Sequence, residues 1–455
     1  MNSTFSDTIC AIATPNGVGA IAIIRVSGTD AYRQVMACFS KDLTQKASHT
    51  VHFGIFKNQS GVFIDEVLVT IFEDGKSFTG EESVEIACHA SPYIQQQIIL
   101  ALIEAGCRLA NPGEFSMRAF ANGKVDLSQA EAIADLIAAQ TKNAHSIALK
   151  QLRGGFSSEL KELREKLIHF ASLVELELDF AEEDVEFADR SALKQLVNEV
   201  LAYIQRLAAS FELGNAIKNG VPVAIVGAPN TGKSTLLNQL LGEDRAIVSN
   251  IAGTTRDVIE ETLNIDGILF RLIDTAGIRE NAEEIEAMGI ERSREKIVQA
   301  KIVLCLADLS VSTSIEEVLN WAKEIHSTHP DKKIVIVANK QDISSNSIEF
   351  SDNMISISAK EGVGIAALKE KLVEIVIGDF SLSDETIVSN IRHYDALIKT
   401  ATSLQKAKEN LATGITADFV AMDIRQAMFD LGTITGDIST DDLLGNIFSK
   451  FCIGK

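Results

Sequence analysis

Residues 222–241 read PVAIVGAPNTGKSTLLNQLL, and this stretch decides how the middle of the chain folds. Gly227 to Ser234 fit the pattern GxxxxGK[ST], between a strand-like apolar run and a run with helical spacing. That order predicts a strand, a loop whose N–H groups surround phosphate oxygens, and a helix whose N-terminus attracts anions. We expect Lys233 to reach the β- and γ-phosphates and the Ser234 hydroxyl to bind Mg²⁺. The stretch therefore predicts a nucleoside triphosphate site.

Four further motifs follow in the order that a guanine-nucleotide site needs. GTTRD (253–257) supplies a threonine for the Mg²⁺ shell, and DTAG (274–277) follows the strand-like run FRLI. NKQD (339–342) ends the run IVIVAN, and SAK (358–360) would back the base. The Asp342 carboxylate can accept hydrogen bonds from guanine N1 and N2, which adenine lacks. Together the motifs predict a P-loop GTPase domain of the α/β, Ras-like class, with buried parallel strands and crossover helices.

These motifs define a set of candidate GTP-binding residues. They are Asn230, Thr231, Gly232, Lys233, Ser234, Thr235, Thr254, Thr255, Asp274, Thr275, Ala276, Gly277, Asn339, Lys340, Asp342, Ser358, Ala359 and Lys360.

Two details go beyond a generic GTPase. The residue after DTAG is Ile278, so this chain lacks there the glutamine that orients water in Ras-type enzymes. Asn230 lies in the phosphate loop, where its side-chain oxygen can ligate a monovalent cation that supplies the charge of an arginine finger. The alternative for Asn230 is a residue that only shapes the loop.

The pattern of apolar residues differs on either side of this domain, and these differences predict the domain boundaries. Short β-rich runs at 20–26, 67–72 and 84–89 dominate the N-terminal part, with one helix around 91–105. Helical spacing follows, and it returns near the C-terminus. The predicted domains are therefore an α+β domain over 1–122, a helical domain over 123–217 and 381–455, and an inserted GTPase domain over 218–380.

Composition limits the possible classes. The chain has 455 residues, 42 basic against 63 acidic, a net charge of -21, and six scattered cysteines. Scattered cysteines favour a reducing compartment, and no run reaches the roughly 18 apolar residues that span a bilayer. We expect a cytoplasmic protein without a membrane partner. An RNA substrate needs a local basic patch or a more basic partner, because the net charge repels nucleic acid.

The C-terminal sequence FCIGK (451–455) resembles the terminal signature of the MnmE (TrmE) family of tRNA-modifying GTPases. The resemblance covers essentially the whole chain. It includes the segments DTICAIATPNGVGAIAIIRVSG, SFTGEESVEI, NPGEFSMRAFANGKVDLSQAEAIADLI, GAPNTGKSTLLN, AIVSNIAGTTRDVIEE, DTAGIRE and STDDLLGNIFSKFCIGK.

The resemblance implies an architecture and an activity. The N-terminal domain would bind a tetrahydrofolate derivative (5-formyl or 5,10-methylene) and form a constitutive homodimer. The partner would be MnmG (GidA), an FAD protein, in a heterotetramer. Together they would install an aminomethyl or carboxymethylaminomethyl group at C5 of the tRNA wobble uridine, with the methylene carbon taken from the folate. The GTPase would depend on K⁺ as well as Mg²⁺.

The resemblance also implies site residues. Arg25, Glu81, Lys124 and Lys455 would bind folate. Ser234 and Thr255 would hold Mg²⁺, while Asn230, Ser249, Ile251 and Thr254 would hold K⁺, which adds Ser249 to the GTP site. Residues expected in catalysis are Glu286, Lys233, Arg256 and Cys452.

Some of these roles have alternatives. Glu286 would replace the missing glutamine, although Glu283 and Glu284 are close enough in sequence to take that role. Arg256 and Arg279 would brace the switches or be ordinary surface arginines. Cys452 follows an apolar helical stripe (443–451), and a free cysteine is more often a small buried hydrophobe than a nucleophile.

The P-loop domain alone leaves other functions open. The first alternative is a regulatory or ribosome-assembly GTPase, and a weaker one is a stand-alone folate enzyme with a regulatory GTPase. Binding of 5-formyltetrahydrofolate separates the first alternative from a tRNA-modifying enzyme.

Overall fold

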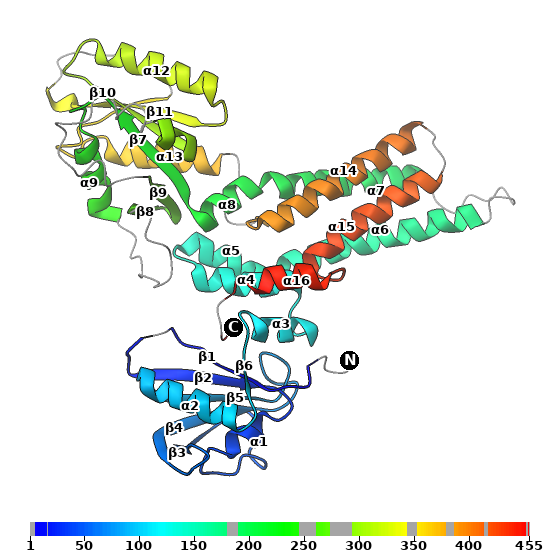
Figure 1. Cartoon of the computed structure of the whole chain (residues 1–455). Helices are drawn as coiled ribbons and strands as arrows, with labels where there is room; N and C mark the ends of the chain where they lie inside the picture. Colours follow the sequence, from blue (N-terminus) through cyan, green and yellow to red (C-terminus); the bar gives the residue numbers. More distant parts are fainter. Residues whose placement is uncertain are drawn as a thin grey trace. The chain divides into compact units, whose positions relative to one another are not determined.

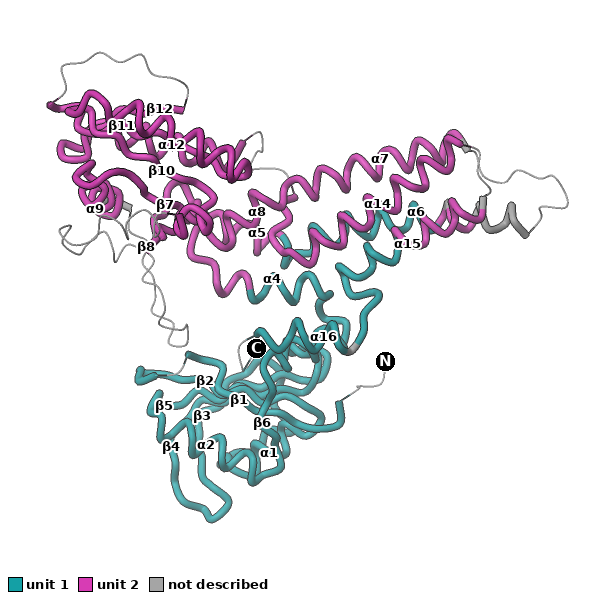
Figure 2. Tube along the Cα trace, turned by 45° about the horizontal axis from the view of Figure 1, so that its top comes forward, with its two compact units in different colours: residues 1–134, 151–168, 428–455 teal, residues 135–150, 169–427 magenta. Residues whose placement is uncertain are grey.

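The computed structural model describes nine stretches of the chain: 5–15, 17–179, 190–244, 261–273, 294–343, 353–378, 386–413, 417–451 and 454. The chain forms two compact units, drawn in different colours in Figure 2. Unit 1 comprises residues 1–134, 151–168 and 428–455, and unit 2 comprises residues 135–150 and 169–427.

Unit 1 contains a six-stranded sheet in the order β3-β4-β5-β2-β1-β6 (Figure 1). Neighbouring strands are antiparallel except for β1 and β6, which are parallel. The strands are β1 (Ile9–Ile12), β2 (Ile21–Ser27), β3 (Thr50–Lys57), β4 (Phe63–Phe72), β5 (Ser83–His89) and β6 (Arg108–Leu109). The strands predicted at 20–26, 67–72 and 84–89 are therefore confirmed.

Alternation along the strands gives this sheet one face that α1 and α2 cover, and an opposite face that Phe115 covers at β1 and that is open on β3 and β4. Ala22, Ile24 and Val26 of β2 are buried in a core cluster with residues of α1 (Ala31–Met36) and α2 (Pro92–Glu104). Side chains in a strand point alternately to opposite faces, so the intervening residues point away from that core. On the outer strands, Phe53 and Leu68 are paired across β3 and β4 and are both exposed.

The N-terminal part contains more helix than the sequence predicts. The helix expected around 91–105 is α2, which begins with Pro92 in its first turn and ends before Gly106 at φ +109°. However, α1 and α3 (Glu114–Ala121) are helical as well, so the expectation of one helix was wrong. Both are at most eight residues long, too short to show a helical period reliably.

The C-terminal end of the chain belongs to unit 1. Helix α16 (Asp441–Phe448) packs with α3, and Phe448 is buried beside Leu127 and Ala130 of α4 (Leu127–Ala138). The apolar stripe on α16 therefore faces a small core, as its spacing predicts. Further on, a Cβ built on Gly454 would clash with the backbone oxygen of Ile12, so the terminus lies against the end of β1.

Unit 2 contains the second six-stranded sheet, in the order β12-β11-β10-β7-β9-β8. All neighbouring strands are parallel except β8 and β9. The strands are β7 (Val221–Gly227), β8 (Glu261–Ile265), β9 (Ile268–Leu272), β10 (Ile302–Asp308), β11 (Lys333–Asn339) and β12 (Met354–Ser356). The helices that accompany them are α9 (Lys233–Asp244), α12 (Ser314–Thr328) and α13 (Ile365–Ile377).

Both faces of this sheet are covered, which explains its nearly continuous apolar strands. Val223 and Ile225 of β7 are buried in one cluster with residues of α9 and α13. Ala224 and Val226 are buried in a second cluster with residues of α12. Because β7, β10, β11 and β12 are parallel, their carboxyl ends meet at one edge of the sheet, where ligands of open α/β sheets bind.

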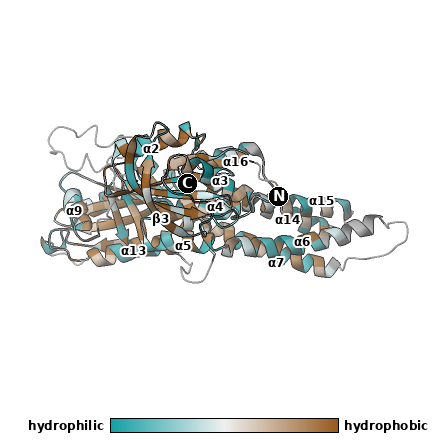
Figure 3. Cartoon of the chain, turned by 90° about the horizontal axis from the view of Figure 1, so that it is seen from below, coloured by the Kyte–Doolittle hydropathy of each residue, from teal (hydrophilic) through white to brown (hydrophobic). Residues whose placement is uncertain are grey.

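The helical elements flank the α/β part in sequence, as predicted. They are α5 (Lys142–Leu152), α6 (Gly155–Asp179), α7 (Arg190–Ala209), α8 (Phe211–Asn219), α14 (Ile391–Thr413) and α15 (Ala417–Thr435). Of these, α5, α6, α7, α14 and α15 carry both hydrophobic and hydrophilic colours in Figure 3, as amphipathic helices of a bundle do.

Entry to and exit from the α/β part lie side by side. The backbone N–H of Val388 donates to the Ser210 hydroxyl oxygen at 3.0 Å, and Phe211 stacks on Tyr394 with 4.5 Å between ring centroids. Gly214 packs so closely on the Val388 carbonyl that a Cβ would clash there. The GTPase-like part is thus an insertion between helical segments. Within the described residues, none of the helices combines the length and the low polarity that crossing a bilayer requires.

Candidate functional site

The phosphate loop occupies the turn between β7 and α9. Asn230 has φ +63°, a left-handed conformation, and the Thr231 hydroxyl donates to the backbone oxygen of Ala228 at 2.9 Å. Lys233 begins α9, and its ammonium donates to the backbone oxygens of Gly227 and Ala228 at 2.9 and 2.7 Å. Burial, and then the charge of Lys296, lower the pKa of Lys233. Anionic phosphates would offset both effects, so this lysine is prepared for an anionic ligand.

Asn339 joins the phosphate loop to the base-recognition motif. Its amide nitrogen donates to the backbone oxygen of Thr231 at 2.8 Å, and its amide oxygen accepts from the backbone N–H of Ala359 at 3.0 Å. Asn339 is 2% exposed. A Cβ on Gly232 would clash with the Asn339 amide nitrogen, which explains why glycine precedes Lys233. The structure thus brings three separate motifs together.

Asp342 lies beside this junction, in the short helix η2 (Gln341–Ile343). The Ser358 hydroxyl donates to Asp342 Oδ1 at 2.6 Å and lowers the pKa of that carboxyl. The carboxylate is exposed and oriented, as needed for an acceptor of guanine N–H groups. Lys360 follows Ser358 by two residues and is also exposed.

Lys340, between Asn339 and Asp342, has φ +68°. Its ammonium donates to Asp308 Oδ2 at 2.6 Å. Asp308 is the last residue of β10, whose partner in β11 is Asn339. The predicted guanine motif is therefore tied to the end of the neighbouring strand.

Ser234 and Thr235 follow Lys233 in the first turn of α9 and are exposed at the helix N-terminus. The other predicted nucleotide and cation residues lie outside the described residues. They are Ser249, Ile251, Thr254, Thr255, Arg256, Asp274, Thr275, Ala276, Gly277 and Glu286, together with the alternatives Glu283 and Glu284.

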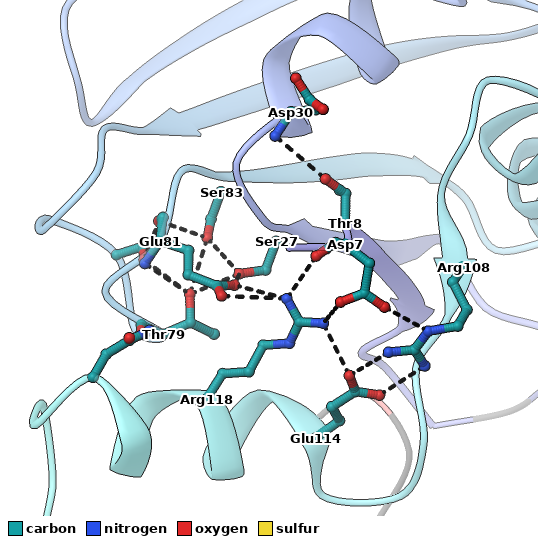
Figure 4. A network of polar contacts seen from close by, with 12 residues as sticks. Asp7, Thr8, Ser27, Asp30, Thr79, Glu81, Ser83, Arg108, Glu114 and Arg118 are labelled. Atoms are coloured by element: carbon teal, nitrogen blue, oxygen red, sulfur yellow. Dashed lines mark hydrogen bonds and ion pairs between the residues drawn. The ribbon is translucent and has the colours of Figure 1, made fainter. Parts of the chain in front are cut away.

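The predicted folate residue Glu81 belongs to a buried polar network in unit 1 (Figure 4). Arg118 of α3 is fully buried, and its Nη1 donates to Glu81 Oε1 and Oε2 at 3.2 and 3.3 Å. The Ser27 hydroxyl donates to Glu81 Oε2 at 2.8 Å. A carboxylate has about four acceptor positions, so Glu81 keeps capacity for a further donor.

Arg118 also joins Glu81 to two other carboxylates. Its Nη2 donates to Asp7 Oδ1 at 2.7 Å and to Glu114 Oε1 at 3.0 Å. Arg108 contacts the same two acids at 2.7 and 2.6 Å. Burial raises the pKa of the Glu114 carboxyl, but hydrogen bonds from Arg108, the Asn111 N–H and Arg118 outweigh burial and lower it. The network contains three carboxylates and two guanidinium groups, so full ionisation leaves one negative charge for a donor-rich ligand.

The other folate candidates have different surroundings. Arg25 of β2 pairs with Glu85 of β5 at 2.8 Å, and its guanidinium lies 5.8 Å from the Phe78 ring centroid. The Lys124 stem packs beside Gly80, where a Cβ would lie 3.1 Å from Lys124 Cγ. Lys124 and Glu81 are thus brought to the same loop. Cys452 and Lys455 lie outside the described residues, although their neighbour Gly454 contacts the end of β1.

Sequence reasoning missed two residues. Arg118 lies within the segment that carries the family resemblance, but nothing local separates it from a surface arginine. Asp308 ends the predicted strand KIVLCLAD, and an acidic residue at the carboxyl end of a parallel strand was a usable signal.

Comparisons with known proteins cover nearly the whole chain. The family descriptions "GTP-binding protein TrmE N-terminus" and "MnmE helical domain" match residues 8–124 and 127–452. A tRNA modification GTPase MnmE from Flavobacterium johnsoniae is 51% identical over 463 residues, covering 99% of each chain. The protein of that name from Cytophaga hutchinsonii is 51% identical over 455 residues, covering 99% of this chain and 98% of the relative.

Among solved structures, the G domain of the T. maritima FeoB iron transporter is 26% identical and covers 34% of this chain and 97% of that chain. The TM-score of that match is 0.26.

Proposed function

This chain belongs to the MnmE (TrmE) family, and from that premise we propose that it is a tRNA modification GTPase. The observation that carries the proposal is the bond from Asn339 to Thr231, which unites the base motif with the phosphate loop. A guanine-nucleotide site in a chain that matches tRNA modification GTPases along its full length favours this activity over other GTPase functions.

In the GTPase part, we propose that phosphates bind along the loop from Asn230 to Ser234 and that Asp342 binds the guanine edge. Ser234 and Thr255 would hold Mg²⁺, and oxygen donors are the ligands that Mg²⁺ prefers. Asn230, Ser249, Ile251 and Thr254 would hold K⁺. Asn230 is exposed in the phosphate loop, which leaves its side-chain oxygen accessible to a cation. Glu286 would orient water, and Arg256 would brace the site.

In unit 1, we propose a folate site formed by Arg25, Glu81, Lys124 and Lys455. The spare acceptor position of Glu81 suits the N–H donors of a pterin edge, and cationic side chains suit the glutamate carboxylates of folate. The folate supplies a one-carbon unit when it is bound. The residues of this chain bind and orient it. Cys452 would line this site or take part in its chemistry.

Two partners follow from the same proposal. The open part of the first sheet carries exposed Phe53 and Leu68, which supports a homodimer that buries this part. An FAD-containing MnmG protein would complete the enzyme and would bring positive charge toward tRNA, since this chain carries a net charge of -21. We also propose the domain boundaries 1–122, 123–217, 218–380 and 381–455, and a cytoplasmic location.

Mass spectrometry of tRNA nucleosides tests the proposal. A strain that lacks this protein should lose the C5-substituted wobble uridine, and the intact gene should restore it. A Lys233→Ala gene should not restore it, because this substitution removes the phosphate-binding ammonium. Unchanged wobble nucleosides together with failure to bind 5-formyltetrahydrofolate would instead favour a regulatory or ribosome-assembly GTPase.

A further inference from the structure

Asp308 has a side chain that is held from several directions. Its Oδ1 accepts from the Ser310 N–H at 2.9 Å and from the Ser310 hydroxyl at 2.6 Å, while Oδ2 accepts from Lys340 at 2.6 Å. The Asp308 side chain is 11% exposed. Burial raises the pKa of this carboxyl, but the hydrogen bonds from Lys340 and Ser310 and the charge of Lys340 outweigh burial and lower it. Asp308 is therefore a preorganised anion at the end of β10.

Without Asp308, the Lys340 side chain would not be held in one orientation. Two other residues of the motif are fixed by other groups: Asn339 by Thr231 and Ala359, and Asp342 by Ser358. The backbone of Lys340 follows the end of β11, and the Leu309 N–H donates to the Asn339 oxygen at 2.9 Å. A free lysine side chain has many rotamers, and a ligand that orders it pays the entropy cost. Because Asp308 already holds the ammonium of Lys340, less entropy is lost when a ligand binds.

We propose that Asp308 is a positioning residue for guanine nucleotides, which holds the Lys340 ammonium so that the aliphatic stem of Lys340 packs against the base. This inference rests on the proposed guanine site at residues 339–342. Alkyl stems of lysine pack on apolar surfaces while the charged end keeps a polar partner. Asp308 itself would contact Lys340 and not the nucleotide.

The two aspartates would then have separable effects. Asp342 reads the edge of the base, where guanine differs from hypoxanthine by the 2-amino group. The Lys340 stem contacts the face of the ring, which the two bases share. Loss of Asp308 should therefore weaken the binding of guanine and hypoxanthine nucleotides equally, whereas loss of Asp342 should remove the preference for guanine.

The test is calorimetric titration of the full chain with GDP and IDP. We expect Asp308→Asn to raise both dissociation constants about tenfold and to leave their ratio unchanged. Asp331→Asn is the matched control, because Asp331 pairs with Lys332 in the same unit and its side chain is 71% exposed. This control should bind both nucleotides like the wild type. Wild-type affinities in Asp308→Asn would overturn the inference.

A double-mutant cycle separates positioning from general damage. In a Lys340→Met background, Asp308→Asn should change the GDP affinity by less than about twofold, because its effect acts through the missing ammonium. A full additional loss in that background would overturn the inference. If Asp308→Asn fails to fold, Ser310→Ala removes the hydroxyl that holds the carboxylate and should give a smaller loss of the same kind.

Failure of the guanine site itself would look different. If Asp342→Asn and Lys340→Met both leave GDP affinity unchanged, the proposed site is wrong and Asp308 has nothing to position. If those two variants bind weakly while Asp308→Asn binds normally, the site stands and only the positioning role fails.

Discussion

The amide nitrogen of Asn339 donates to the backbone oxygen of Thr231 at 2.8 Å, across 108 positions of sequence. This bond makes the phosphate loop and the guanine motif parts of one buried structure. A substitution at Asn339 should therefore alter both stability and nucleotide affinity.

Asn339→Ala should lower the free energy of unfolding by about 2–4 kcal/mol, because the Thr231 carbonyl and the Ala359 N–H lose their partner in a buried site. GTP affinity should fall with it. Urea unfolding and GTP titration measure the two effects. The matched control is Asn219→Ala, since Asn219 is exposed and bonds only one side chain among the described contacts. Equal stability of both variants would contradict the structural role.

Asp342→Asn should weaken GTP binding about a hundredfold while leaving the fold intact, because a charge-assisted acceptor is lost from an exposed position. Ser358→Ala should cause a smaller loss, since it frees the carboxylate without removing it. Equilibrium titration with GTP, and circular dichroism as a control for folding, distinguish these results. Wild-type affinity in Asp342→Asn would refute the assignment.

Hydrolysis of GTP should need K⁺, because Asn230 is the proposed cation ligand and Ile278 replaces the water-orienting glutamine. Replacing K⁺ by Na⁺ should lower turnover at least tenfold, about 1.4 kcal/mol of barrier. The difference should disappear in Asn230→Ala. Steady-state phosphate release in the two salts at equal ionic strength tests this. Equal rates for the wild type would disprove the cation site.

Glu286→Ala should abolish hydrolysis and spare GTP binding, because the group acts in the transition state and not in binding. A fall in turnover of about 10²–10⁴ is typical for an orienting group. Single-turnover hydrolysis beside binding of a fluorescent GTP analogue measures both. Survival of activity in Glu286→Ala, with loss in Glu283→Ala or Glu284→Ala, moves the role to that residue.

Arg118→Met should destabilise the protein by about 3–5 kcal/mol at pH 7, because it removes the cation that pairs with buried Glu81 and leaves Glu114 with Arg108 alone. The folded pKa of Glu114 is lowered, so its contribution is present above the ordinary value of 4.5 and is lost as pH falls through the folded pKa. The difference in the free energy of unfolding between Arg118→Met and the wild type should therefore become smaller at acid pH.

Denaturant unfolding at a series of pH values tests this dependence. Arg33→Met serves as the control, because the pair of Arg33 with Asp30 is exposed and such pairs contribute about 0–1 kcal/mol. A difference that stays constant down to acid pH would show that Arg118 stabilises the unit by packing and not by charge.

Much of the GTP site could be predicted from sequence because its chemistry is contiguous. The phosphate loop uses adjacent residues from Gly227 to Ser234 between a strand and a helix, so one short pattern contains both the ligands and the geometry. The strands β7, β10 and β11 can be predicted equally well from the sequence, because burial on both faces requires uninterrupted apolar runs. The resemblance added the assignments in the switch segments.

The tertiary structure decided which polar groups face each other. Glu81 alone is typical of a surface carboxylate, yet it is 4% exposed beside Arg118. Its burial is tolerable only when partners from distant segments neutralise and hydrogen-bond it, and no local pattern encodes that arrangement. The same holds for Lys340 and Asp308, which lie 32 positions apart and meet because β10 and β11 pair. Local order follows from neighbouring residues, whereas the energy of a buried charge depends on contacts that only the completed fold supplies.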